Sequence, residues 1–327
     1  MAPSLGSPAS HVTADMCELE RSDPLLAAGQ RRRPMFPLRY PALYDMYKKI
    51  QRSAWIAEEI DPAQDAEDWD CLSSGERRFV THALACCAAS GAIAWQSLSS
   101  RFLREVRVPE ARAFYSFQLA LGNIHAEAYA FLLQQYVDNV HERDSMCAAV
   151  HGLPALRRKL DWAAQWISEE CSFAERLVAF ACVECILSCG AFCAFEWLTK
   201  KRGLLPGLLF ATELISRDNR LHTEFACLVY RTLQHKLPEG VAHDIVREAV
   251  EAERGFICGA VPCDLVGLSS ELVARYVEFV GDSLLVALGH GEVFGTPNPF
   301  DALEPLEILS TEADTDGSDA SWSDSDF

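Results

Sequence analysis

The chain has 327 residues, 50% of them hydrophobic, which is enough to bury one large core or two small ones. Its formal net charge of −18 argues against nucleic acid or an anionic membrane as a general partner. It has no run of eighteen apolar residues, and residues 1–20 lack the basic start and apolar block of a secretory signal. We therefore expect a cytoplasmic protein.

The chain divides into three parts by composition. Residues 1–35 are rich in Pro, Ser, Gly and Arg without a hydrophobic period, so we expect a flexible N-terminal segment there. Residues 36–300 have a helical pattern almost throughout and form the expected domain. Residues 301–327 hold nine acids and no Lys or Arg, which predicts a disordered acidic tail that carries half of the net charge.

Long helices are expected in chain order within the domain. The first covers 41–60 and places one apolar stripe along Leu43, Met46, Tyr47, Ile50, Ala54 and Ala57. The second, within 72–103, starts with a capping pattern of Ser73 and Glu76. Further helices are expected at 109–137, 174–201, 203–233, 239–256 and 269–289. With no strand-like alternation, the sequence predicts an all-α bundle.

Cysteines are frequent, and four of the thirteen follow one helical stripe: Cys182, Cys185, Cys189 and Cys193. A C-x-x-C pair is found in zinc and redox sites. The flanking residues here are small, apolar and helix-periodic, with no second C-x-x-C pair. We expect reduced thiols that pack in the core as small hydrophobic groups.

The spacing of two histidines resembles that of helical bundles that bind two metal ions. Such bundles use Glu-x-x-His on two helices and single acids on two others. The protein has two such sites, but Gly122 precedes His125 and Asn219 precedes His222, so both acids are absent. Glu184 is alone in an apolar helix, where an unpaired carboxylate costs several kcal/mol. Each histidine alone would be better explained as a hydrogen-bonded core residue. The matched offsets and the lone acid together make coincidence a poor explanation.

The segments that contain these residues resemble a known family. They include "FPLRYPALYDMYKKIQRSAWIAEEID" at 36–61, "ARAFYSFQLALGNIHAEAY" at 111–129, "ERLVAFACVE" at 175–184 and "ELISRDNRLHTEFACL" at 213–228. The protein resembles the small, radical-bearing subunit of eukaryotic class I ribonucleotide reductase from about residue 23 to residue 302. The resemblance implies a ferritin-like bundle in an enzyme that converts ribonucleoside diphosphates to deoxyribonucleotides.

The family has a di-iron centre whose ligands are one Asp, three Glu and two His. By resemblance the Asp position is Gly91, and two of the Glu positions are Gly122 and Asn219. The remaining ligands match Glu184, His125 and His222, so three of six are present.

The resemblance also extends to the residues that form and carry the radical in this family. The radical tyrosine matches Tyr129, and the radical path matches Trp55 and Asp218. The path ends at a tyrosine in the family's tail, but this protein has no tyrosine after Tyr276.

The charge balance argues against a di-iron centre. A diferric centre with one bridging oxide carries about +4, which four carboxylates neutralise, and only Glu184 is left here. A glycine inside a helix costs about 1 kcal/mol, which is less than an uncompensated buried acid. We expect no cofactor, or at most iron in a reduced or mononuclear site.

Three hypotheses follow. The first is a non-catalytic paralogue that forms a dimer with an active small subunit and docks on the large subunit through Trp322, Asp326 and Phe327 in the tail. The second is a mononuclear iron site of two His and one carboxylate, although Glu127 and Glu224 point away from the histidine faces. The third is a metal-free subunit in which Tyr129 is oxidised elsewhere.

Overall fold

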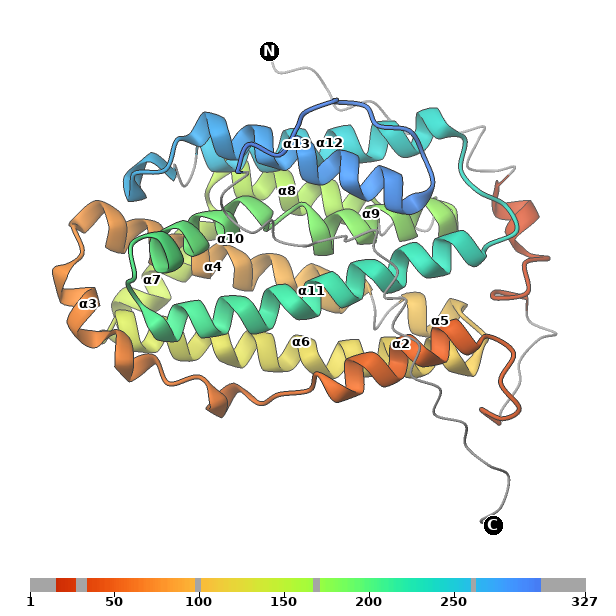
Figure 1. Ribbon diagram of the computed structural model, residues 1–327, viewed down its shortest axis with the longest axis horizontal. Coiled ribbons are helices and arrows are strands. Elements are labelled where there is room, and N and C mark those ends of the chain that lie inside the picture. The colour runs from red at the N-terminus through yellow and green to blue at the C-terminus, as the bar shows by residue number, and fades with distance from the viewer. Residues whose placement is uncertain (1–15, 28–33, 98–100, 167–170, 260–262, 301–327) are drawn as a thin grey trace, which may run out of the picture.

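A computed structural model describes residues 16–27, 34–97, 101–166, 171–259 and 263–300, and side chains in all of these except 92–97. Within these ranges the protein is all-α and contains no strand, as the sequence predicts. Long helices lie roughly parallel or antiparallel along one axis, with α6 and α11 side by side and α12 and α13 above them in the view shown (Figure 1). This is the ferritin-like arrangement, in which any site lies between facing helices.

The helix bounds fit the expected starts closely. The helices are α2 (Pro41–Arg52), α3 (Ala66–Cys71), α4 (Ser74–Ser97), α5 (Leu103–Glu105), α6 (Pro109–Tyr136), α7 (Val140–His151), α8 (Pro154–Trp166), α9 (Phe173–Cys185), α10 (Cys189–Glu196), α11 (Pro206–Thr232), α12 (Glu239–Gly259) and α13 (Ser270–Leu288).

The predicted capping box before α4 is confirmed. The Ser73 amide donates to the Glu76 carboxylate at 2.7 Å, and the Glu76 amide donates to Ser73 Oγ at 3.3 Å. Each residue satisfies an amide that the first turn of the helix leaves free.

The predicted helix at 41–60 is too long. It ends at Arg52, so Ala54 and Ala57 lie beyond it. The cause is tertiary: Arg217 on α11 donates to the Ser53 carbonyl at 2.6 Å, and the Trp55 indole donates to Asp218, also on α11. These contacts pull the backbone out of the helix and place Trp55 in a loop.

The predicted single helix at 174–201 is also wrong, because it breaks between α9 and α10. The Leu187 amide donates back to the Cys182 carbonyl at 3.1 Å, one residue further than in an α-helix. After the break, Gly190 packs so tightly on α12 that an added Cβ would lie 2.4 Å from Ile257. The Gly190 amide donates to Glu253, which forms a buried ion pair of 2.6 Å with Lys159.

The stretch Phe173–Lys201 is long and apolar enough to cross a membrane by composition, but 89% of its most apolar part is buried inside the protein. It forms the centre of the bundle. The four stripe cysteines are buried there, as expected for core packing. All thirteen cysteines are free thiols, although Cys71 and Cys258 are exposed and do not pack in the core.

Part of the expected N-terminal segment packs on the bundle. Residues 16–20 form a helical turn, and the Glu20 carboxylate accepts from the amides of Phe173 and Ala174 at 2.7 Å each, which caps the start of α9. Leu25 is fully buried. Residues 1–15 and 28–33 of that segment, and the tail at 301–327, lie outside the described residues.

The last described residues are held on α13. The Asp282 carboxylate accepts from three successive amides, of Val293, Phe294 and Gly295, at 2.8–3.0 Å. The Phe300 ring then packs edge-on against Tyr276, with the ring centroids 5.6 Å apart. The point from which residues 301–327 continue is therefore fixed on the bundle.

The start of α11 depends on a buried acid at the end of a short 3-10 helix, Pro62–Asp65, that comes directly before α3. Asp65 accepts from the amides of Gly207 and Leu208 at 2.6 and 3.0 Å, and from the Tyr136 hydroxyl at 2.5 Å. It is fully buried, so these donors have no access to water if the carboxylate is removed.

We expect Asp65→Ala to lower the free energy of unfolding by about 2–4 kcal/mol, because it removes a helix cap and leaves buried donors without partners. Urea unfolding followed by circular dichroism measures this. The control is Glu67→Ala, an exposed acid two residues away, which should change stability by less than about 0.5 kcal/mol. Equal effects from the two changes would contradict the capping role.

Candidate functional site

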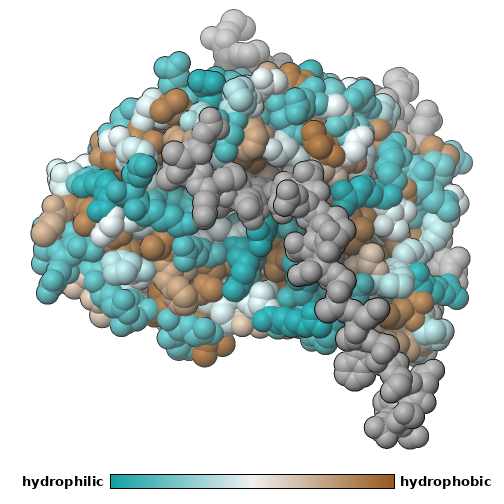
Figure 2. All heavy atoms as spheres, in the orientation of Figure 1, coloured by the Kyte–Doolittle hydropathy of each residue, from teal (hydrophilic) through white to brown (hydrophobic). Residues whose placement is uncertain are grey.

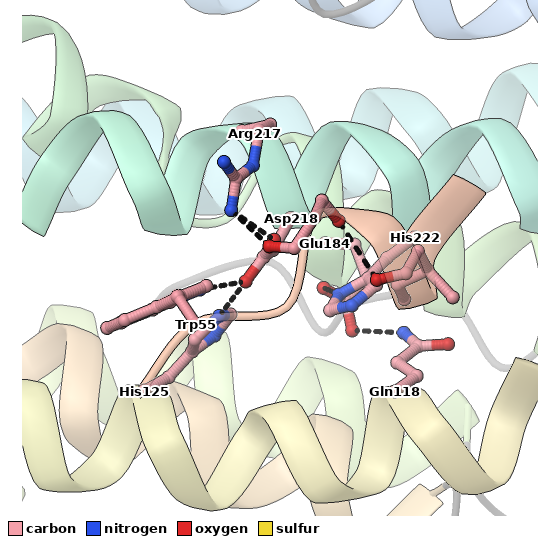
Figure 3. Close-up of polar contacts among 9 residues, drawn as sticks. Trp55, Gln118, His125, Glu184, Arg217, Asp218 and His222 are labelled. Carbon is pink, nitrogen blue, oxygen red and sulfur yellow. Dashed lines mark hydrogen bonds and ion pairs between the residues drawn. The ribbon is translucent and has the colours of Figure 1, made fainter. Parts of the chain in front are cut away.

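The candidate residues lie together in the middle of the bundle, where α4, α6, α9 and α11 surround a cavity of about 270 Å³. His125 comes from α6, Glu184 from α9, and Asp218 and His222 from α11. Figure 3 shows these side chains pointing toward one another between the facing helices, with Trp55 entering from its loop. The structure therefore brings together residues that span more than half of the sequence.

Asp218 is the centre of the first group. Its Oδ2 atom accepts from the Trp55 indole at 2.7 Å and contacts His125 Nε2 at 2.9 Å. The indole and the imidazole rings are stacked, with centroids 5.9 Å apart. Asp218 is fully buried, and Arg217 approaches its other oxygen at 3.6 Å.

These contacts stabilise a charged carboxylate inside the protein. Burial alone would raise the pKa of Asp218, but the hydrogen bonds from His125 and Trp55, together with the charge of His125, hold it below its usual value. Asp218 is therefore a fixed negative charge that orients both rings.

Glu184 is the centre of the second group. Its two oxygens contact different side chains: Oε2 contacts His222 Nδ1 at 3.0 Å, and Oε1 accepts from the Gln118 amide at 3.1 Å. All three side chains are buried. The lone acid of the apolar helix is therefore paired, which is the condition for a carboxylate at such a position.

The three positions where the resemblance predicts missing ligands face the same cavity. Gly91, Gly122 and Asn219 all line it. A Cβ added at Gly91 would have no neighbour within 4 Å. The absent carboxylates thus account for part of the open volume.

Tyr129 also lines the cavity, and its side chain is 7% exposed. Burial, with smaller contributions from Cys87 and Glu184, raises its pKa well above the usual value. The phenol is therefore held protonated next to the cavity.

The donor set does not fit a pair of metal ions. Among the described residues, no group of three His, Cys, Asp or Glu side chains could hold even one ion. His125 Nε2 contacts Asp218 and His222 Nδ1 contacts Glu184, and the two imidazole centroids are 6.1 Å apart. Two irons need about four carboxylates as well as both histidines.

Glu127 and Glu224, which each follow a histidine by two residues, do not line the cavity. Glu127 is exposed, and Glu224 forms an ion pair of 2.9 Å with Lys49 at the surface. The expectation that both point away from the histidine faces is confirmed.

Two residues of the site, Gln118 and Arg217, were not predicted from the sequence. Gln118 lies four residues before Gly122 on α6, which puts it on the same helix face, and this spacing could have indicated it. Arg217 has no comparable signal, because its contact with the Ser53 carbonyl depends on where α2 ends. The predicted partner-binding residues Trp322, Asp326 and Phe327 lie outside the described residues.

Comparison with known proteins gives a consistent match. A family model described as "Ribonucleotide reductase, small chain" matches residues 32–299. The protein is 50% identical over 286 residues to the ribonucleoside-diphosphate reductase small chain of Nicotiana tabacum, covering 88% of its own length and 87% of the relative. It is 46% identical over 287 residues to the ribonucleoside-diphosphate reductase small subunit of Dictyostelium discoideum, covering 88% and 85%.

Solved structures agree with this match. The ribonucleotide reductase Rnr4 homodimer from Saccharomyces cerevisiae superposes with a TM-score of 0.84 at 31% identity, covering 89% of this protein and 92% of that one. The R2 subunit from Clostridium botulinum superposes with a TM-score of 0.77, covering 87% and 94%, and at 19% identity it supports the fold alone.

We expect the protein to hold far less than two irons per chain after aerobic incubation with ferrous salt. The triple variant Gly91→Asp/Gly122→Glu/Asn219→Glu should hold close to two, because it restores the four carboxylates. Elemental analysis after desalting measures both. The control places three acids on the surface, as Gly240→Asp/Gly259→Glu/Gln234→Glu, and should bind no more iron than the unchanged protein. Two tightly held irons in the unchanged protein would contradict the donor argument.

Proposed function

The chain belongs to the ribonucleotide reductase small-chain family, and from this we propose that it is a small-subunit component that does not generate a radical itself. The observation that carries the proposal is the state of the remaining ligands. His125, Glu184 and His222 are each paired with another protein group, and the positions of the other three ligands are Gly91, Gly122 and Asn219. No oxidant for Tyr129 follows from such a donor set.

In this proposal the bundle serves as a structural partner. It pairs with a small subunit that has all six ligands and supports the assembly or loading of that partner. The two buried acids have protein partners of their own, since Asp218 is stabilised by Trp55 and His125, and Glu184 by Gln118 and His222. A subunit that folds without a cofactor fits this role.

The second part of the proposal concerns the large subunit, on which the acidic tail would dock. Trp322 and Phe327 are the only aromatic residues after Phe300, and they lie among acidic and small residues. Aromatic anchors commonly dominate the binding energy of a short docking segment. The proposed setting is the cytoplasm, where thirteen free thiols would stay reduced.

We expect no tyrosyl radical signal from this protein in electron paramagnetic resonance after incubation with ferrous salt and oxygen, because Tyr129 lacks an oxidant. A family member with all six ligands, treated in the same way, is the positive control. A radical signal that disappears in Tyr129→Phe would overturn the non-catalytic assignment and favour a metal-free or mononuclear mechanism.

We expect the double variant Trp322→Ala/Phe327→Ala to bind the large subunit at least about tenfold more weakly than the unchanged protein, because it removes both anchors. Biolayer interferometry with immobilised large subunit measures the affinity. The matched control Ser323→Ala/Ser325→Ala changes the neighbouring tail residues and should bind as the unchanged protein does. Unaltered binding by the double aromatic variant would show that the tail is not the docking element.

A further inference from the structure

The cavity of about 270 Å³ retains chemical features that the proposed function does not use. A cavity of about 150 Å³ can hold a benzene molecule, so this one has room for a somewhat larger compound. Its outer side is accessible, because Gly91, Asn123 and Ala126 line it and are exposed.

The inner wall has two buried atoms with no hydrogen-bond partner, Gln118 Oε1 and His222 Nε2. Gln118 is 1% exposed and His222 3% exposed. The Gln118 amide nitrogen donates to Glu184, so the free atom is the amide oxygen, an acceptor. A carboxylate only accepts, so His222 Nδ1 carries a proton toward Glu184, and Nε2 is the ring nitrogen that is left without a partner.

The charges of the lining residues also indicate which kind of ligand the cavity would bind. Glu184 is an acid in the lining, and no Lys or Arg occurs among the described residues that line the cavity. His125 also lines the cavity, but its Nε2 faces Asp218, whose carboxylate balances the charge of that ring. One carboxylate and one free amide oxygen favour a ligand that is positively charged and has several hydrogen-bond donors.

A single metal ion is a poorer occupant than an organic cation. Metal ions in proteins need about four to six donors that converge on one point, and no group of three such side chains is present among the described residues. The rest of the lining includes the apolar side chains Ala88, Leu119, Ala126 and Val183, which suit a compact hydrocarbon body.

We propose that the cavity is a binding site for a small primary amine or amidine with a compact apolar body, whose charged group bonds to Glu184 and Gln118. The inference rests on the part of the proposed function that leaves the cavity without metal. The metal content of every sample is therefore measured first, so a failure of that premise is recognised independently of ligand binding.

The test measures ligand binding to the full-length protein by isothermal titration calorimetry, with benzamidine as the probe. Neutral benzamide and anionic benzoate, which have a similar shape, are the comparison ligands. Benzamidine should bind at least about tenfold more tightly than either, because a charge-assisted hydrogen bond contributes more than a neutral one. Glu184→Gln should remove most of this preference while circular dichroism confirms the fold.

The site is located with a variant that should fold normally. Gly91→Leu fills the cavity from a position where an added Cβ has no neighbour within 4 Å, and it should weaken benzamidine binding at least about tenfold. Gly240→Leu is the matched control, since a Cβ there is equally free and the residue lies on α12 away from the cavity. It should leave binding unchanged.

Three results would overturn the proposal. The first is the absence of binding to metal-free protein at millimolar benzamidine, which would mean that the cavity holds water only. The second is benzoate binding as tight as that of benzamidine. The third is unaltered benzamidine binding by Gly91→Leu.

Discussion

The carboxylate of Asp218 joins three parts of the protein that are far apart in sequence. Asp218 lies on α11. Its carboxylate accepts a hydrogen bond from Trp55 in the loop after α2 and contacts His125 on α6. Because a buried carboxylate is costly without partners, both contacts are needed for α11 to pack against α6 at this point. The end of α2, the position of Trp55 and the orientation of His125 all depend on this one group.

Glu184 has an equivalent role on the other side of the cavity, with Gln118 and His222 as its partners. Each of the two acids thus has two ring or amide partners. The coloured part of the face shown in Figure 2 mixes hydrophilic and hydrophobic residues, and no single apolar patch dominates it.

Much of this arrangement was predictable from the sequence. The start of α4 follows from the Ser73–Glu76 capping pattern, and the start of α6 from the helical pattern that begins at residue 109. The spacing typical of metal-binding bundles, together with the family resemblance, grouped His125, Glu184 and His222 around one centre. Local patterns failed where a distant residue decides the structure. The end of α2 depends on Asp218, 163 residues beyond Trp55, and the break after α9 is followed by the contact of Gly190 with Ile257. Helical periodicity contains no information on such contacts.

The attachment of residues 293–295 to Asp282 has a consequence for assembly. It fixes Phe300 on the bundle, and the 27 residues numbered 301–327 can reach at most roughly 95 Å from that point. If the far end of these residues binds a partner, the local concentration of the bundle around that partner depends on this length and on the position of the anchor. Releasing residues 293–300 from Asp282 would add to this reach and lower the local concentration of the bundle around its partner, even with every contact at the far end intact.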